Sequence, residues 1–207
     1  MNQAITPEDL IKSLETDPNS QIQVTQNVTL RTNPAKHTLA KEYQRIPRAI
    51  VELFLKSHQK MTNTEDTLAY NQKADSYRKE VAAQINNIRE DMEKLTSKWE
   101  IILAEMGHSI ETNYNNTQTI QVQITAPEER DFYDLIETMD HLLVVMDNLW
   151  FAKEQSLEDK QRVTGHLVKA MAGLGANSER KAKALIRLRA MLRNPNREKE
   201  AVLETNE

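Results

Sequence analysis

The sequence predicts a mainly α protein with a small β ribbon, and three observations lead to this fold class. Long stretches repeat apolar residues every three or four positions, which is the spacing of an amphipathic helix. Two short stretches alternate apolar and polar residues, as a half-buried strand does. Only four Gly and six Pro occur among 207 residues, so turn material is scarce and we expect few, long elements.

The first expected elements are a short helix and a strand. Thr6-Pro7 and the acids after it mark a helix start, and this helix should end near Glu15. Residues 21–31 then alternate as a strand, whose apolar face comprises Ile22, Val24, Val28 and Leu30. The opposite face holds uncharged polar residues and one arginine, namely Gln21, Gln23, Thr25, Asn27, Thr29 and Arg31.

The next expected elements are two helices. Asn33-Pro34 begins a helix over about 34–58, in which Pro47 should introduce a kink or a split. A long helix from about 64 to 106 carries an unbroken heptad seam of Val81, Ile85, Ile88, Met92, Leu95, Trp99, Ile102 and Met106. Such a seam needs a partner helix, either from residues 130–153 of the same chain or from a second copy, and we expect a homodimer.

The second half of the chain begins with another alternating strand over residues 119–125. Its apolar side is Ile120, Val122 and Ile124, and its polar side includes Thr119, Gln121 and Gln123. Thr125 and Glu128 fit a capping box, which starts a largely buried helix that ends near Ala152. Strand, capped proline and helix thus recur at 21–58 and 118–153. The strand phases do not superpose when the prolines are aligned, so we infer only a similar layout.

The C-terminal region predicts two helices, 157–174 and 178–193, joined by a tight corner in the segment Gly173-Leu174-Gly175-Ala176-Asn177-Ser178. We expect residues 1–20 to form an N-terminal short helix or arm, residues 21–193 one elongated domain, and residues 194–207 a disordered tail.

Composition and motifs point away from an enzyme. The chain has no Cys, which excludes disulfides and thiolate metal sites, and its five His lack metal-ligand spacing. We find neither a phosphate-binding glycine loop nor a nucleophile elbow, so we expect no catalytic residues, no metal, no cofactor and no small-molecule substrate. There is no signal peptide pattern, and the longest apolar run, 142–146, is too short to cross a membrane, so we expect a cytoplasmic protein.

Charge is segregated along the chain. Residues 160–199 carry eleven Lys/Arg and two acids, a net charge of +9, whereas the remainder carries sixteen bases and 29 acids, a net charge of −13. A positive surface of this size attracts a polyanion such as nucleic acid. The alternative is that the basic segment neutralises the acidic body within the molecule.

The polar strand faces suggest how such a polyanion could be recognised. Thr, Asn, Gln and Arg can read base edges in the major groove, which admits a two-stranded ribbon. We expect base contacts from the ribbon and phosphate contacts from the basic helix beside it; the candidate residues are Gln23, Thr25, Asn27, Thr29, Arg31, Gln121, Gln123, Arg180, Lys181, Lys183 and Arg187. Two alternatives stay open: a merely solvated sheet face, or a C-terminal helix-turn-helix that reads bases from Ser178, Arg180, Lys181 and Lys183.

Over residues 20–193 the chain resembles AcaB-type transcriptional regulators of conjugative plasmids and integrative elements. The resemblance rests on QIQVTQNVTLRTNPAKHTLAKEYQRI, on the long middle helix, and on RDFYDLIETMDHLLVVMDNLW before the basic segment. It implies a dimeric ribbon-helix-helix-like DNA-binding core, here elaborated with a long heptad helix and C-terminal helices. It also implies a site upstream of a promoter and activation of transfer genes.

The function expected from the sequence is therefore sequence-specific binding of double-stranded DNA, as a transcriptional regulator of a mobile element. One alternative is a non-catalytic assembly or accessory protein of a DNA-transfer complex that acts through its heptad helix. Another is a non-specific nucleic-acid binder.

Overall fold

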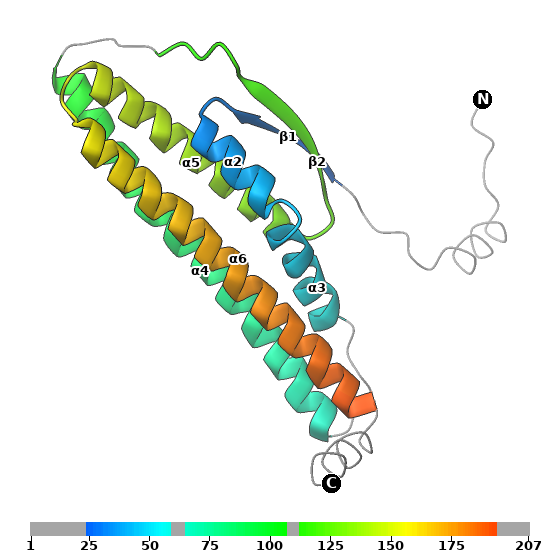
Figure 1. Ribbon diagram of the computed structural model, residues 1–207. Helices are drawn as coiled ribbons and strands as arrows, with labels where there is room; N and C mark the ends of the chain where they lie inside the picture. The colour runs from blue at the N-terminus through cyan, green and yellow to red at the C-terminus, as the bar shows by residue number, and fades with distance from the viewer. Residues whose placement is uncertain (1–23, 59–64, 107–111, 194–207) are drawn as a thin grey trace, which may run out of the picture.

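The computed structural model describes residues 24–58, 65–106 and 112–193, which form a helical body with a small ribbon (Figure 1). The elements in chain order are β1 (Val24–Leu30), α2 (Asn33–Glu42), α3 (Ile46–His58), α4 (Glu65–Glu105), β2 (Gln118–Ile124), α5 (Pro127–Phe151) and α6 (Leu157–Arg193). The predicted fold class, mainly α with a small β ribbon, is confirmed. The short helix expected near Glu15, the strand residue Gln23 and the tail 194–207 lie outside the described residues.

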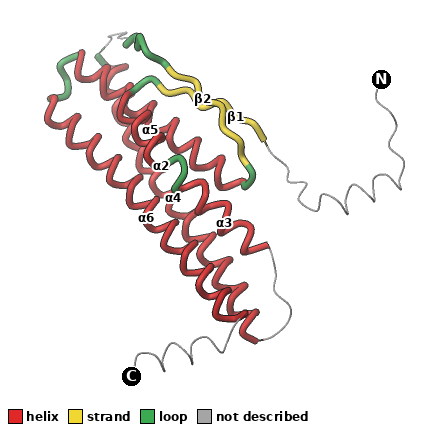
Figure 2. The backbone as a smooth tube through the Cα atoms, turned by 45° about the vertical axis from the view of Figure 1, so that its right-hand side comes forward, coloured by secondary structure: helices red, strands yellow, loops and turns green. Residues whose placement is uncertain are grey.

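The body is built around two long antiparallel helices, α4 and α6, which lie side by side in both backbone views (Figures 1 and 2). Helix α4 has 41 residues, a length of about 60 Å at roughly 1.5 Å per residue. The chain splits before Pro47, as predicted, because α2 ends at Glu42 and α3 begins at Ile46.

The heptad seam of α4 is covered by helices of the same chain. Val81, Ile85 and Met92 are at most 2 % exposed, and Leu95 and Trp99 pack against the same core. The partners are chiefly α5 and α6. Of the two partners that the seam allowed, the intramolecular one is therefore observed, and the seam gives no reason to invoke a second copy.

The prediction of a corner at residues 173–178 is wrong, because α6 runs unbroken from Leu157 to Arg193. Gly175 serves close packing instead of a turn: a Cβ there would collide with the carboxylate of Glu42 and lie 3.3 Å from Ile46 Cγ1. Ser178 is fully buried, and its hydroxyl donates to the carbonyl of Leu174. A helix-turn-helix in this region is thereby excluded.

The ribbon forms within one chain, because β1 and β2 pair antiparallel with each other. Each strand is followed by two helices, β1 by α2 and α3, and β2 by α5 and α6. The two strands have the same pattern of exposure along their seven residues. Their central residues, Asn27 and Gln121, face each other, so the pairing is nearly two-fold symmetric.

The weak repeat in the sequence is thus a structural repeat at an offset of 94 residues, from Val24 to Gln118 and from Asn33 to Pro127. The strand phases failed to match in the sequence because the prolines do not occupy equivalent positions. Pro127 is the first residue of α5, whereas Pro34 is the second residue of α2.

The strand faces follow the predicted alternation with one exception. Val28, Leu30, Val122 and Ile124 are buried as expected, but Val24 is 55 % exposed at the open end of the ribbon. The predicted capping residue is displaced by one position, since α5 begins at Pro127 and its third residue is Glu129. The Glu129 carboxylate accepts from the backbone N–H groups of Thr125 and Ala126, at 2.6 and 2.9 Å.

The helical glycines give a test of the continuous α6. A Cβ at Gly173 meets nothing within 4 Å, so Gly173→Ala should raise the free energy of unfolding by about 0.5–1 kcal/mol through helix propensity. Gly175→Ala should lower it, because the methyl group meets a buried carboxylate. Urea unfolding followed by circular dichroism measures both. A corner at this place would instead make both substitutions destabilising.

Candidate nucleic-acid interface

The ribbon presents one face of six exposed, uncharged polar side chains, which we call the polar face: Thr25, Asn27, Thr29, Thr119, Gln121 and Gln123. They sit in three cross-strand pairs, Thr25 with Gln123, Asn27 with Gln121, and Thr29 with Thr119. The hydroxyls of Thr29 and Thr119 lie 3.0 Å apart and share a hydrogen bond. The structure thus brings together the polar sides that the two strands were expected to have.

The opposite face of the ribbon anchors it to the helices. Val28, Leu30 and Val122 are fully buried in the core that α5 also lines. Two-stranded ribbons are marginally stable alone, so this packing is what holds the strands in register. The polar face is left on the outside of the molecule, to one side of α2 and α5 (Figures 1 and 2).

One buried carboxylate fastens the end of β1 to α5. Asp140 is 1 % exposed, and its oxygens accept hydrogen bonds from both residues that follow β1. The donors are the backbone N–H of Arg31 at 3.1 Å, the Nε of Arg31 at 3.0 Å, the backbone N–H of Thr32 at 2.7 Å and the hydroxyl of Thr32 at 2.8 Å. Charge-assisted bonds of this kind are stronger than neutral ones.

Other carboxylates of α5 line the outer edge of β1. Glu137 accepts from the backbone N–H of Thr29, and Asp134 accepts from the amide of Gln26, both at 2.9 Å. These bonds occupy an edge that would otherwise be open to pairing with another strand. They also leave the surroundings of β1 acidic rather than basic.

Arg31 was expected on the polar face, and the structure places it at the end of that face. Its side chain is 38 % exposed and pairs with Asp140 through Nε. The guanidinium therefore supports the ribbon and still reaches solvent with its remaining N–H groups.

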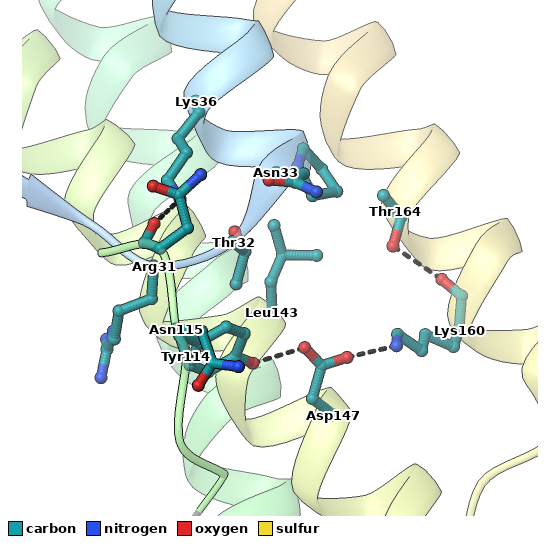
Figure 3. Close-up of a pocket in the computed structure, with 12 residues that line it drawn as sticks. Arg31, Thr32, Asn33, Lys36, Tyr114, Asn115, Leu143, Asp147, Lys160 and Thr164 are labelled. Atoms are coloured by element: carbon teal, nitrogen blue, oxygen red, sulfur yellow. Dashed lines mark hydrogen bonds and ion pairs between the residues drawn. The ribbon is translucent and has the colours of Figure 1, made fainter. Parts of the chain in front are cut away.

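The loop before β2 is fixed by polar contacts around a hollow of about 350 Å³ beside Arg31 (Figure 3). The Tyr114 hydroxyl donates to Asp147, which also pairs with Lys160. Burial, together with that hydrogen bond, raises the pKa of Tyr114. Lys36 donates to the backbone carbonyl of Asn116. Both lysines of this hollow are thus engaged in holding the loop, and with it β2.

The basic half of α6 does not lie beside the ribbon, which corrects the expected arrangement. Figures 1 and 2 place it toward the other end of the body, with α2 and α5 between it and the strands. It packs instead on α3 and α4. Counting charges along a sequence gives no direction in space, and the continuous α6 carries its last turns away from the ribbon.

The four basic candidates of α6 differ in their surroundings. Lys181 is 9 % exposed, bonds to Glu80 and lies 4.5 Å from the ring centre of Tyr77, so it is not available to a phosphate. The Lys181 bond holds the pKa of Glu80 below its usual value. Arg180, Lys183 and Arg187 are exposed. Part of the basic segment therefore pairs within the molecule, as one of the two sequence interpretations expected.

Among the described residues there is no cluster of three or more His, Asp or Glu suited to a metal ion. No helix in the described ranges is long and apolar enough to span a bilayer.

The geometry defines the chain as a helical protein that carries an intrachain, nearly two-fold ribbon with an exposed polar face. No family model and no curated protein matches the chain. Among solved structures it is similar to AcaB from uropathogenic E. coli, with a TM-score of 0.70, 17 % sequence identity and coverage of 88 % of both chains. The chain thus has an AcaB-like fold, which confirms the resemblance at the level of the fold.

The Asp140 bonds predict a large effect of removing one charge. Asp140→Asn keeps the shape but replaces one acceptor oxygen by a donor that faces other donors. The free energy of unfolding should fall by about 2–4 kcal/mol. Glu100→Gln is the matched control, since Glu100 pairs with His141 at an exposed site, and should change stability by less than about 0.5 kcal/mol. Equal effects in urea unfolding would contradict the role of Asp140.

Proposed function

We propose that the chain binds double-stranded DNA by inserting the ribbon into the major groove, with the polar face against the base edges. The observation that carries this proposal is the polar face itself: six hydrogen-bonding side chains without charge, on a two-stranded antiparallel ribbon. Such a ribbon fits the major groove, where amides can pair with adenine and a threonine methyl can contact thymine. A face that is only solvated would usually carry Lys and Glu as well.

In this proposal one chain supplies the whole reading element. Both strands belong to the same molecule, and the central pair is Asn27 with Gln121. The expected homodimer is therefore not needed to complete the ribbon. Because the two strands present nearly the same side chains in opposite directions, the preferred site should be an imperfect inverted repeat.

Arg31 is a further proposed contact, to guanine or to a phosphate at the end of the ribbon, through the N–H groups that Asp140 leaves free. Arg180, Lys183 and Arg187, which the sequence predicted as phosphate contacts, lie on a separate surface, so we do not include them in the contact with the duplex that the ribbon reads.

The resemblance to AcaB-type regulators supports a more specific role. We propose that the bound DNA lies upstream of a promoter for conjugative-transfer genes on a mobile element, and that binding activates transcription. A reporter fused to such a promoter should rise when the chain is expressed. An unchanged or lowered reporter would contradict activation while leaving DNA binding intact.

The alternative assembly function loses the feature that suggested it. It required the heptad seam of α4 as a docking surface, and that seam is largely packed inside the chain.

Selection from a random duplex library tests the proposal directly. The library should yield an enriched site, and Asn27→Ala and Gln121→Ala should each weaken binding to it by about 1–3 kcal/mol while hardly changing binding to random duplex. Gln72→Ala, an exposed amide on α4, is the control and should leave both affinities unchanged. No enriched site, or equal losses on both duplexes, would remove the ribbon from a reading role.

The unequal pair of positions gives a sharper test. Thr29 and Gln123 occupy equivalent positions, each the sixth residue of its strand, yet they differ in side chain. Thr29→Gln should make the two half-sites selected from a library more alike. Sequencing of bound duplexes measures this, and an unchanged asymmetry of the selected site would contradict the two-fold reading.

A further inference from the structure

The strongest unexplained surface is a positively charged groove between the α2–α3 corner and the second half of α6. Two adjoining hollows, of about 610 and 300 Å³, share Glu179 and Lys183 in their linings. We call this surface the cationic groove and define it by six basic residues from α2, α3, α6 and the turn between α2 and α3, namely Lys41, Arg45, Arg48, Arg180, Lys183 and Arg187. Bases at separate places in the sequence thus meet on one surface.

The acids at this groove are all paired. Glu179 accepts from Arg45 at 2.9 Å and from Lys183 at 2.5 Å, and these two bonds hold the pKa of its carboxyl below the usual value. Glu52 pairs with Lys56 at 3.1 Å. The buried Glu42 lies 3.7 Å from Arg45. No carboxylate at the groove is therefore left to neutralise the other bases.

Four cations remain exposed and have no ion pair within the described ranges: Lys41, Arg48, Arg180 and Arg187. Of these, Arg180 donates one hydrogen bond, to the side chain of Asn177. Like charges that are held close together repel, and a bound anion relieves that repulsion. The chain as a whole has a net charge of −4, so this surface is a local exception.

The lining of the groove indicates the kind of anion. Four of the six bases are arginines, whose planar fork matches a phosphate. No aromatic side chain lines either hollow. Single-stranded nucleic acid is usually held by bases stacked on aromatic rings, so the groove favours the phosphate backbone of a duplex.

The groove and the ribbon lie on different surfaces. In Figures 1 and 2 the ribbon is on one side of α2, and α6, which forms one wall of the groove, is on the other. A duplex is stiff on this scale, and bending a site of 20–30 base pairs by 90° costs about 6 kcal/mol. The same short duplex therefore does not reach both surfaces without a large deformation.

From these observations we propose that the cationic groove binds the phosphate backbone of a second duplex segment, so that one chain joins two DNA segments. Joining rests on the ribbon function proposed above, whereas the affinity of the groove for duplex does not. The groove would contribute affinity and salt dependence, and the ribbon would contribute choice of sequence.

The experiment is a bridging assay with the full-length chain. A duplex that carries the selected site is fixed to beads, the chain is added, and capture of a fluorescent duplex of unrelated sequence is measured. The test variant is Arg48→Glu with Arg187→Glu, two exposed residues without an ion pair within the described residues. The control is Lys79→Glu with Lys98→Glu, which makes the same change in net charge on the exposed side of α4.

The test variant should capture about tenfold less fluorescent duplex than the unaltered chain. Its affinity for the selected site should stay within about threefold of that of the unaltered chain. The control should capture as well as the unaltered chain. Circular dichroism melting confirms that both variants are folded. Undiminished capture by the test variant, or an equal loss in the control, would overturn the proposal, and so would an unaltered chain that binds its site but captures nothing.

A second measurement separates failure of the groove from failure of the ribbon. The dependence of random-duplex affinity on salt should flatten by about one unit in Arg187→Ala and by about two units in the double variant, because each lost phosphate contact changes the slope by roughly 0.9. Asn27→Ala should leave this slope unchanged. A slope unchanged in the groove variants overturns the groove, whereas loss of an enriched site alone overturns only the ribbon.

Discussion

The arrangement of the whole ribbon depends on the bonds that the buried carboxylate of Asp140 accepts. Arg31 and Thr32 donate to it from the backbone and from their side chains at 2.7–3.1 Å. These two residues join β1 to α2, so one acid on α5 fixes where the strand ends and where the next helix begins. A charge buried without partners would be very costly, and the chain supplies donors for both oxygens.

The second constraint is that both strands come from one chain. An antiparallel ribbon needs two strands of matching register, and here the partner of β1 lies 94 residues away in the sequence. The long α4, with 41 residues, occupies nearly half of that interval and runs back toward the ribbon end of the body. Its apolar seam is packed by α5 and α6, so the connection between the two halves is also the core of the body.

Much of the fold could be predicted because it depends on periodicity. The alternation of residues 24–30 and 118–124 and the heptad spacing of α4 identify these elements before any contact is known. The wrong details depend on contacts between distant residues. Gly175 is a glycine because Glu42 lies against it, and no local pattern distinguishes that reason from a turn.

The location of the candidate site was only half predictable for the same reason. The outward side of each strand follows from alternation, so the polar face was identified correctly as a surface. The direction of a basic helix depends on whether the chain turns before it, and α6 does not turn. Lys181 looks like its neighbours in the sequence, but it packs over the ring of Tyr77 and pairs with Glu80 on α4, which leaves it largely buried.

The intrachain ribbon has a consequence for how the occupancy of a target would depend on the concentration of the chain. DNA-binding ribbons that are formed by two subunits dissociate on dilution. Their occupancy of a target rises with the square of subunit concentration when subunits are scarce. A ribbon closed within a single molecule needs no such encounter. If the ribbon reads DNA as proposed, its occupancy of the target would follow the first power of chain concentration, so a cell holding few copies would respond in proportion to them.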